Sequence, residues 1–305
     1  MKQYLYKIIY SPVINKIIRG LIKPFSYAAP GFLKIPPTGR LTFKLKEGKE
    51  FKLETNQTSY LTKVIYWKGI NSFEYTKLFS DLIKNCKVFF DIGANIGYYS
   101  IMAATSSRTV NVFSFEPAEG PQKYLERNIR INGFQDRIMN NNLALSNEAG
   151  KITFYEVNNE KYSYLKYNLS GVGNAEGVKH DRKMSEYEVS SNRLDNFVNE
   201  NNIHGIDIIK IDTEGTEYLI LEGARESIIK YKPIIICETL FDKIEAKLEE
   251  LLKSFGYQFF NHSNNELYLV DTIIRKEDDG IRDCFFVHPE KYHLIKKYVH
   301  TDKES

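Results

Sequence analysis

The chain has 305 residues, of which 42% are hydrophobic and 13% aromatic. This composition can fill a sizeable core, which excludes a globally disordered chain. The net charge of +3 is uneven, because nine basic residues and no acid precede Glu47, which leaves the remainder at −6. An enzyme acting on nucleic acid should carry basic surface around its active site, so the acidic remainder argues against a nucleic-acid substrate.

Residues 1–36 combine basic and apolar side chains. Between Val13 and Lys23, apolar residues recur at helical spacing and basic residues lie toward the other face. No uncharged apolar run approaches the roughly 20 residues of a membrane-spanning helix. Pro12 interrupts the only candidate for a signal-peptide core. Two roles stay open: a helix docked on the catalytic domain, or a basic amphipathic segment on a membrane surface.

The next segment carries a hairpin pattern followed by a helical one. Apolar and polar residues alternate over residues 41–53 around Gly48, which predicts a β-hairpin. Residues 58–87 favour helix, with Tyr75 and Phe79 on one face. We therefore expect a basic extension (1–40), an N-terminal cap (41–87), a catalytic domain (88–290) and a C-terminal tail (291–305).

An apolar run, 88–90, leads into a glycine-containing turn from Asp91 to Gly97, and an apolar helix follows. A buried strand, a glycine turn and a helix N-terminus form the nucleotide-binding corner of α/β proteins. Asn95 stands where a dinucleotide-binding turn needs a glycine to approach pyrophosphate. Asp91 would repel a diphosphate but attract an ammonium group. Both details favour S-adenosylmethionine (SAM), which carries an ammonium group and no phosphate.

Glu116 supports the same cofactor. It closes the next predicted strand, 19 residues after Gly97, where a carboxylate can accept both ribose hydroxyls. The alternative without a ligand is an ordinary strand-turn-helix corner in which Asp91 caps the helix. This alternative does not explain the position of Glu116. The predicted cofactor-binding residues are Asp91, Gly93, Ala94, Asn95, Gly97, Glu116, Asn142 and Asp212.

An alternating series of strands and helices then continues to the C-terminus. Strands are expected at 110–116, 137–146, 152–157, 187–189, 206–211, 233–238, 257–260, 267–270 and 284–287. Residues 158–185 lack apolar periodicity and are expected to form a lid or substrate loop, or else a plain surface loop. His180 lies in this insertion and is a weak candidate for a general base.

Acidic residues cluster after the strand at 206–211. Ligands of open α/β sheets sit outside the carboxyl ends of the strands, so Asp212 should lie beside Asp91. The candidate catalytic residues are Asp212, Glu214 and Glu238. The alternative is that Asp212 only caps the next helix, as first-turn acids commonly do. Lys210 is expected to pair with Glu238, and the carboxylates could hold Mg²⁺, although acids alone are weak evidence for a metal.

These motifs together resemble one known family. The segment Asp91–Gly97, Glu116-Pro117 and the string from Ile208 to Gly215 resemble the FkbM family of SAM-dependent methyltransferases, over residues 73–240. The resemblance implies a doubly wound, Rossmann-like α/β fold with a mostly parallel seven-stranded sheet, SAM as donor, and a hydroxyl oxygen as acceptor.

The resemblance defines the chemistry better than the substrate. The acceptor is expected to be a sugar in a surface glycan or glycolipid, or alternatively a small natural product. A nicotinamide-dependent oxidoreductase and a non-catalytic SAM-binding protein are the remaining alternatives. Three widely spaced cysteines without a metal-binding pattern suggest buried thiols in a reducing cytoplasm.

Overall fold

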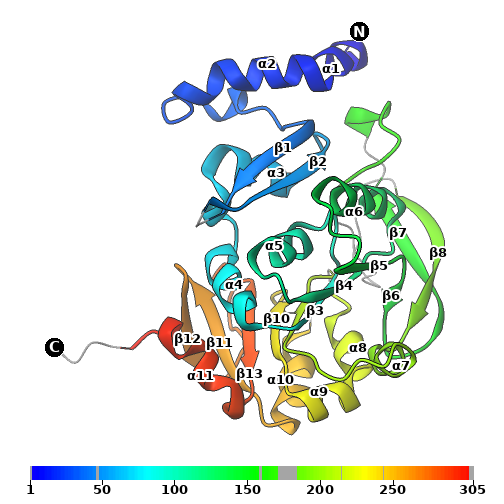
Figure 1. Ribbon diagram of the computed structural model, residues 1–305, viewed down its shortest axis with the longest axis vertical. Helices are drawn as coiled ribbons and strands as arrows, with labels where there is room; N and C mark the ends of the chain where they lie inside the picture. The colour runs from blue at the N-terminus through cyan, green and yellow to red at the C-terminus, as the bar shows by residue number, and fades with distance from the viewer. Residues whose placement is uncertain are drawn as a thin grey trace.

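The computed structural model describes residues 2–45, 48–157, 160–170, 184–213, 215–242 and 244–301. Its centre is an eight-stranded sheet with the strand order β12-β11-β13-β10-β9-β3-β4-β5 (Figure 1). The parallel part comprises β3 (Val88–Ile92), β4 (Asn111–Phe115), β5 (Ile138–Asn141), β9 (Ile208–Ile211) and β10 (Ile234–Glu238). Antiparallel pairings add β11 (Gln258–Ser263), β12 (Glu266–Val270) and β13 (Asp283–Val287).

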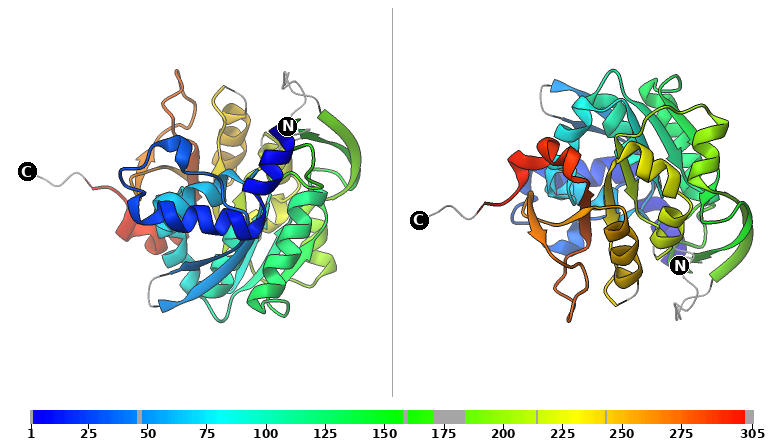
Figure 2. Two further views of the ribbon diagram at one scale, coloured as in Figure 1. Left: turned by 90° about the horizontal axis from the view of Figure 1, so that it is seen from above. Right: turned by 90° about the horizontal axis from the view of Figure 1, so that it is seen from below.

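Helices cover both faces of this sheet (Figures 1 and 2). One core contains Phe89 of β3 and residues of α4 (Thr76–Leu82), α5 (Tyr98–Ser106) and α6 (Glu119–Asn132). The opposite core contains Phe90 and residues of α7 (Leu194–Glu200), α8 (Glu217–Glu222), α9 (Arg225–Tyr231) and α10 (Glu245–Ser254). Successive side chains of a strand point to opposite faces, so a strand buried on both sides needs a continuous apolar run. The predicted doubly wound α/β fold is confirmed.

Two details of the sheet differ from the prediction. The central sheet has eight strands instead of seven, because β12 adds an outer strand next to β11. The expected strand at 137–146 is divided into β5 and β6 (Ala144–Leu145), and β6 joins β7 (Gly150–Val157) and β8 (Met184–Asn192) in a separate three-stranded sheet. β5 ends within a run of three asparagines, residues 140–142, and asparagine is disfavoured in strands.

The N-terminal segment lies at one end of the molecule, beyond the predicted hairpin (Figure 1). It contains α1 (Lys2–Ile9) and α2 (Pro12–Ile22), followed by the hairpin of β1 (Gly39–Lys44) and β2 (Glu50–Thr55) and by α3 (Tyr60–Lys68). No helix in the described ranges has both the length and the apolar character needed to cross a membrane. The chain ends with α11 (Tyr292–Ile295) packed on the core through Ile295. The short 3₁₀ turns are 23–25, 31–33, 70–72, 83–85, 160–162, 289–291 and 296–298.

Candidate active site

The glycine turn after β3 is packed directly against the end of β9. Gly93 has a φ of +71°, and a Cβ atom there would lie 1.9 Å from the backbone oxygen of Asp212. The amides of Gly93 and Ala94 both donate to the carbonyl of Phe115, each at 3.0 Å. Only glycine satisfies both the left-handed backbone and this close approach. The first role of Gly93 is therefore to let the ends of three strands meet.

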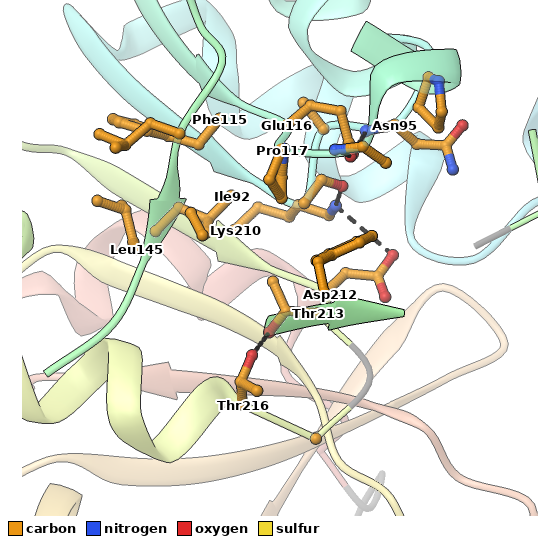
Figure 3. A pocket seen from close by; sticks show the side chains of 18 of the residues that line it. Ile92, Asn95, Phe115, Glu116, Pro117, Leu145, Lys210, Asp212, Thr213 and Thr216 are labelled. Carbon is orange, nitrogen blue, oxygen red and sulfur yellow. Dashed lines mark hydrogen bonds and ion pairs between the residues drawn. The ribbon is translucent and has the colours of Figure 1, made fainter. Parts of the chain in front are cut away.

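The carboxyl ends of β3, β4 and β9 open into a cavity of about 1220 Å³. Ile92, Phe115 and Leu145 form one apolar side of it, and Asn95 and Glu116 lie across from them (Figure 3). Drug-sized ligands occupy pockets of about 300–1,000 Å³. The cavity is therefore large enough for a nucleoside-sized cofactor and part of a second molecule.

Glu116 lines this cavity and also organises the turn. Its Oε2 accepts from the amide of Asn95 at 2.8 Å, and its Oε1 accepts from the amide of Ala118 at 2.9 Å. Burial raises the pKa of Glu116 to about 7, against the lowering effect of those two hydrogen bonds. A carboxylate offers about four acceptor positions, so two remain for hydroxyl donors. The expected ribose-binding role stays a prediction, and the geometry accommodates it.

Three predicted cofactor residues do not line the cavity. Asp91 is fully buried beneath the turn, where its Oδ2 accepts from the hydroxyl of Ser100 at 2.5 Å. Gly97 begins α5 with a φ of +86°, and a Cβ there would lie 2.4 Å from Cδ1 of Leu125 in α6. Asn142 is exposed. A direct contact of these three with SAM stays a prediction, whereas Gly93, Ala94, Asn95 and Asp212 do line the cavity.

Lys210 is the cation at the centre of the site. The predicted ion pair of Lys210 with Glu238 is wrong, because Lys210 pairs with Asp91 and Asp212. Its side chain is 3% exposed and lies 3.5 Å from carboxylate oxygens of both Asp91 and Asp212. Nζ also donates to the carbonyl of Gly93 at 2.9 Å. Burial opposes its charge, but Asp212, Asp91 and Glu74 together raise the pKa of Lys210. The register of β3 and β9 places Asp91 directly opposite Lys210. Asp212 lies two residues after Lys210, so both side chains point to the same face.

Asp212 occupies the place predicted for it at the end of β9, beside the end of β3. Its side chain is 41% exposed and points toward the ammonium group of Lys210 (Figure 3). The loop after it is organised by Glu217, which is fully buried and accepts from the amides of Thr213 and Gly215, each at 3.0 Å. Glu214, another predicted catalytic residue, lies outside the described residues.

A second, acidic cavity of about 370 Å³ adjoins the first, and Glu74 and Asp212 line both. Glu238, Asp283 and His262 also line it, together with Arg282. Desolvation by the surrounding protein, together with Asp212, raises the pKa of Asp283 to about 7. The predicted candidate Glu238 is thus near Asp212 but in the second cavity, away from the glycine turn.

Glu74 is the site residue that sequence reasoning missed. It accepts a hydrogen bond from the hydroxyl of Tyr99 at 2.8 Å and has a φ of +39°, a backbone conformation uncommon for glutamate. Desolvation, followed by the charges of Asp283 and Asp212, raises the pKa of Glu74. It belongs to the predicted N-terminal cap, and no spacing in the sequence connects it to Asp212. A strained polar residue beside a cavity is a signal that only the structure provides.

Segments outside the sheet complete the cavity wall. These are residues 59–61 before and within α3, residues 152–156 of β7, and residues 168–170. The last group belongs to the irregular insertion, whose described part therefore borders the cavity. Its role as a lid or substrate loop stays a prediction, and His180 lies outside the described residues.

The residues present fit SAM. Gly93, Ala94 and Asn95 of the glycine turn line the cavity, Glu116 offers acceptor positions at its edge, and the apolar side can hold a purine ring. For Mg²⁺, no group of three or more His, Cys, Asp or Glu side chains in the described ranges is arranged to hold a metal ion.

Comparisons with known proteins identify the family of this chain. The model of the methyltransferase FkbM domain matches residues 91–259, more than half of the chain. The 31-O-demethyl-FK506 methyltransferase FkbM of Streptomyces tacrolimicus is 30% identical over 190 residues, covering 52% of this chain and 70% of that protein. The 2-O-methyltransferase NoeI of Sinorhizobium fredii is 26% identical over 166 residues, covering 51% of this chain and 65% of that protein.

Among solved structures, the methyltransferase FkbM from Methylobacillus flagellatus KT is similar, with a TM-score of 0.43 and 16% identity. The similarity covers 66% of this chain but only 43% of that one, so this chain matches less than half of its length. The family model carries the assignment. The chain belongs to the FkbM family of SAM-dependent methyltransferases.

Proposed function

We propose that the protein transfers the methyl group of SAM to a hydroxyl of a sugar in a surface glycan or glycolipid. The observation that carries the proposal is that Glu74 and Asp212 line both cavities. The first cavity fits the cofactor, and the second is where an acceptor would reach it.

The acidic character of the second cavity favours a hydroxyl-rich acceptor. Carboxyl oxygens accept hydrogen bonds whether or not the group is ionised, and sugar hydroxyls donate them. Burial lowers the pKa of His262 to about 4. The Nε2 atom of His262 has no hydrogen-bond partner within the described ranges, so it offers the acceptor a further polar atom. An apolar natural product, the alternative acceptor, would favour apolar walls around a few polar groups. The names of two relatives, a 31-O-demethyl-FK506 methyltransferase and a 2-O-methyltransferase, support transfer to oxygen.

We assign Asp212 the role of the base that receives the proton of the acceptor hydroxyl. When bound, SAM supplies an electrophilic methyl group on a positively charged sulfur. An alcohol is a weak nucleophile, so a carboxylate that receives its proton during or after transfer assists the reaction. The ammonium group of Lys210 lies 3.5 Å from the carboxylate of Asp212. Because Asp212 lines both cavities, it is the predicted catalytic residue with access to both reactants.

Glu74 is assigned a different role, that of positioning the acceptor. Glu74 also lines both cavities, and its carboxyl group accepts a hydrogen bond from the hydroxyl of Tyr99. A side chain that only orients the acceptor should affect KM more than kcat, whereas a proton acceptor should affect kcat. Glu74→Gln is therefore expected to raise the KM for the acceptor with a smaller change in kcat.

The test is incubation with methyl-labelled SAM and separated glycan, lipid and small-molecule fractions of cells, with Asp212→Asn as the control for enzyme-dependent label. Label in the glycan or glycolipid fraction that is lost in the control supports the proposal. Label confined to small molecules would establish the alternative acceptor, and label on an amine nitrogen would overturn transfer to oxygen.

A further inference from the structure

Helix α2 is docked through its polar residues. Asn15 and Arg19 are 0% and 3% exposed. The side-chain oxygen of Asn15 accepts from Nε of Arg19 at 2.7 Å and from the amide of Thr38 at 2.9 Å. The guanidinium group of Arg19 lies 4.5 Å from the centre of the Tyr66 ring. Hydrogen bonds and a cation–π contact therefore determine which side of α2 faces the protein.

The opposite side of α2 is apolar and faces outward. Val13, Ile17 and Leu21 recur every four residues and are 71%, 58% and 70% exposed. We call these three residues the N-terminal apolar face. Exposed apolar residues continue beside it in Leu5 of α1 and in Phe25. Single exposed apolar residues are ordinary on protein surfaces, but a row of them along one helix marks an interaction site.

Positive charge surrounds the N-terminal apolar face. Lys7 and Lys16 are exposed, and no acidic residue precedes Glu47. The Nζ atom of Lys23 instead donates to the carbonyl of Tyr66. An apolar helix face flanked by lysines is the pattern of a helix that lies in a membrane interface. Lysines near an anionic lipid surface each add to the attraction. A second copy of this chain would present the same positive charges, and two such faces would repel each other.

We infer that α2 and its flanking segments bind the surface of an anionic lipid bilayer. Val13, Ile17 and Leu21 enter the boundary between headgroups and acyl chains, and Lys7 and Lys16 contact lipid phosphates. Figures 1 and 2 show α1 and α2 at one end of the molecule, where no described element covers their outer side. This inference does not depend on the proposed acceptor.

The surface is connected to the cavity wall. The rings of Tyr6 and Tyr10 in the α1 segment contact the ring of Tyr162, with centroids 5.5 and 5.4 Å apart. The same described segment continues to residues 168–170, which line the cofactor cavity. Membrane binding would thus hold this side of the catalytic domain near lipid, where a glycolipid acceptor would be found.

Co-sedimentation of the full chain with phosphatidylcholine vesicles, with and without phosphatidylglycerol, tests the inference. Binding is expected for the anionic vesicles, at least about tenfold weaker for the neutral ones, and weakened by salt. Replacing Val13, Ile17 and Leu21 together by serine should reduce binding at least about tenfold, since binding strength scales with the apolar area that is buried in the interface. Lys16→Gln should reduce it by about fivefold.

The matched control is Ile229→Ser with Leu269→Ser, because both residues are apolar and 58% exposed elsewhere on the surface. This control should bind vesicles as the unmodified chain does. Melting temperature and SAM affinity, measured on every variant, show that the fold and the cofactor site are intact. Unchanged vesicle binding by the triple serine variant would overturn the inference. So would equal binding to neutral vesicles, or a concentration-dependent dimer that the triple variant abolishes.

Discussion

Replacing Gly93 by alanine should disable the site, although it adds only one methyl group. The new Cβ would lie 1.9 Å from the carbonyl oxygen of Asp212, whereas ordinary contacts begin near 3.4 Å, so either the turn or Asp212 must move. The required shift is about 1.5 Å, and a misplacement of about 1 Å can cost roughly 10²-fold in rate. The left-handed φ of +71° adds about 1–2 kcal/mol of strain for any L-residue.

Gly133→Ala separates the collision from the backbone strain. Gly133 has the same φ of +71°, but a Cβ there would meet nothing within 4 Å. We expect this control to lose about 1–2 kcal/mol of stability and to bind SAM normally. Gly93→Ala should lose roughly 1–3 kcal/mol more, the usual effect of overpacking, and should bind SAM at least about tenfold more weakly.

Chemical denaturation and calorimetric titration with SAM measure the two effects. If Gly93→Ala and Gly133→Ala are equally stable and bind SAM equally well, the turn does not pack against Asp212 as described. A bulkier residue at position 93 should abolish SAM binding, because the collision with β9 grows with side-chain size.

The remaining predictions concern the charged residues of the site. Asp212→Asn should leave SAM affinity within a few-fold but lower turnover by about 10²–10⁴, the usual size of a general-base contribution, in an assay of labelled product. EDTA should leave turnover unchanged, and loss that Mg²⁺ restores would indicate metal assistance. Glu116→Ala should weaken SAM binding by roughly 1–3 kcal/mol in calorimetry. The pKa of Glu116 is raised to about 7, so the carboxylate that accepts ribose hydroxyls becomes protonated below that pH. SAM affinity should therefore fall as the pH is lowered from 8 to 6. A flat pH profile would contradict this role of Glu116. Lys210→Met should cost about 3–5 kcal/mol in urea unfolding, because buried Asp91 loses its cation.

Much of the catalytic core could be predicted from local patterns. The apolar runs at β3 and β9 are long enough to require burial on both faces, and parallel strands bring their carboxyl ends to one edge of a sheet. Together these rules placed Asp212 beside the glycine turn, and the pairing of Ile92 with Ile211 confirms it.

Contacts that depend on register were harder to predict. Lys210 has acidic residues at the ends of both neighbouring strands, and periodicity does not say which of them approaches it. The residue directly opposite, Asp91, became its buried partner. Glu74 was missed because its proximity to Asp212 is created by docking of the N-terminal cap, which no local pattern encodes.

The N-terminal helix shows a different limit. The sequence of α2 predicts an amphipathic helix, but periodicity identifies an apolar face without showing what covers that face. Burial of an apolar stripe against the domain would have been the ordinary outcome. Here Asn15 and Arg19 form the inward contacts instead, because Thr38 and Tyr66 offer them partners.

The most direct test of transfer to a sugar hydroxyl is the chemical linkage of the transferred methyl group. Product from methyl-labelled SAM and the labelled glycan or glycolipid fraction is treated with mild base, then hydrolysed to monosaccharides, and the labelled species is identified by mass spectrometry and NMR. We predict that label survives base and is recovered as the methyl ether of one sugar position. Label released by base as methanol, which indicates a methyl ester, would contradict the proposed function. So would label recovered on nitrogen or on a molecule that contains no sugar.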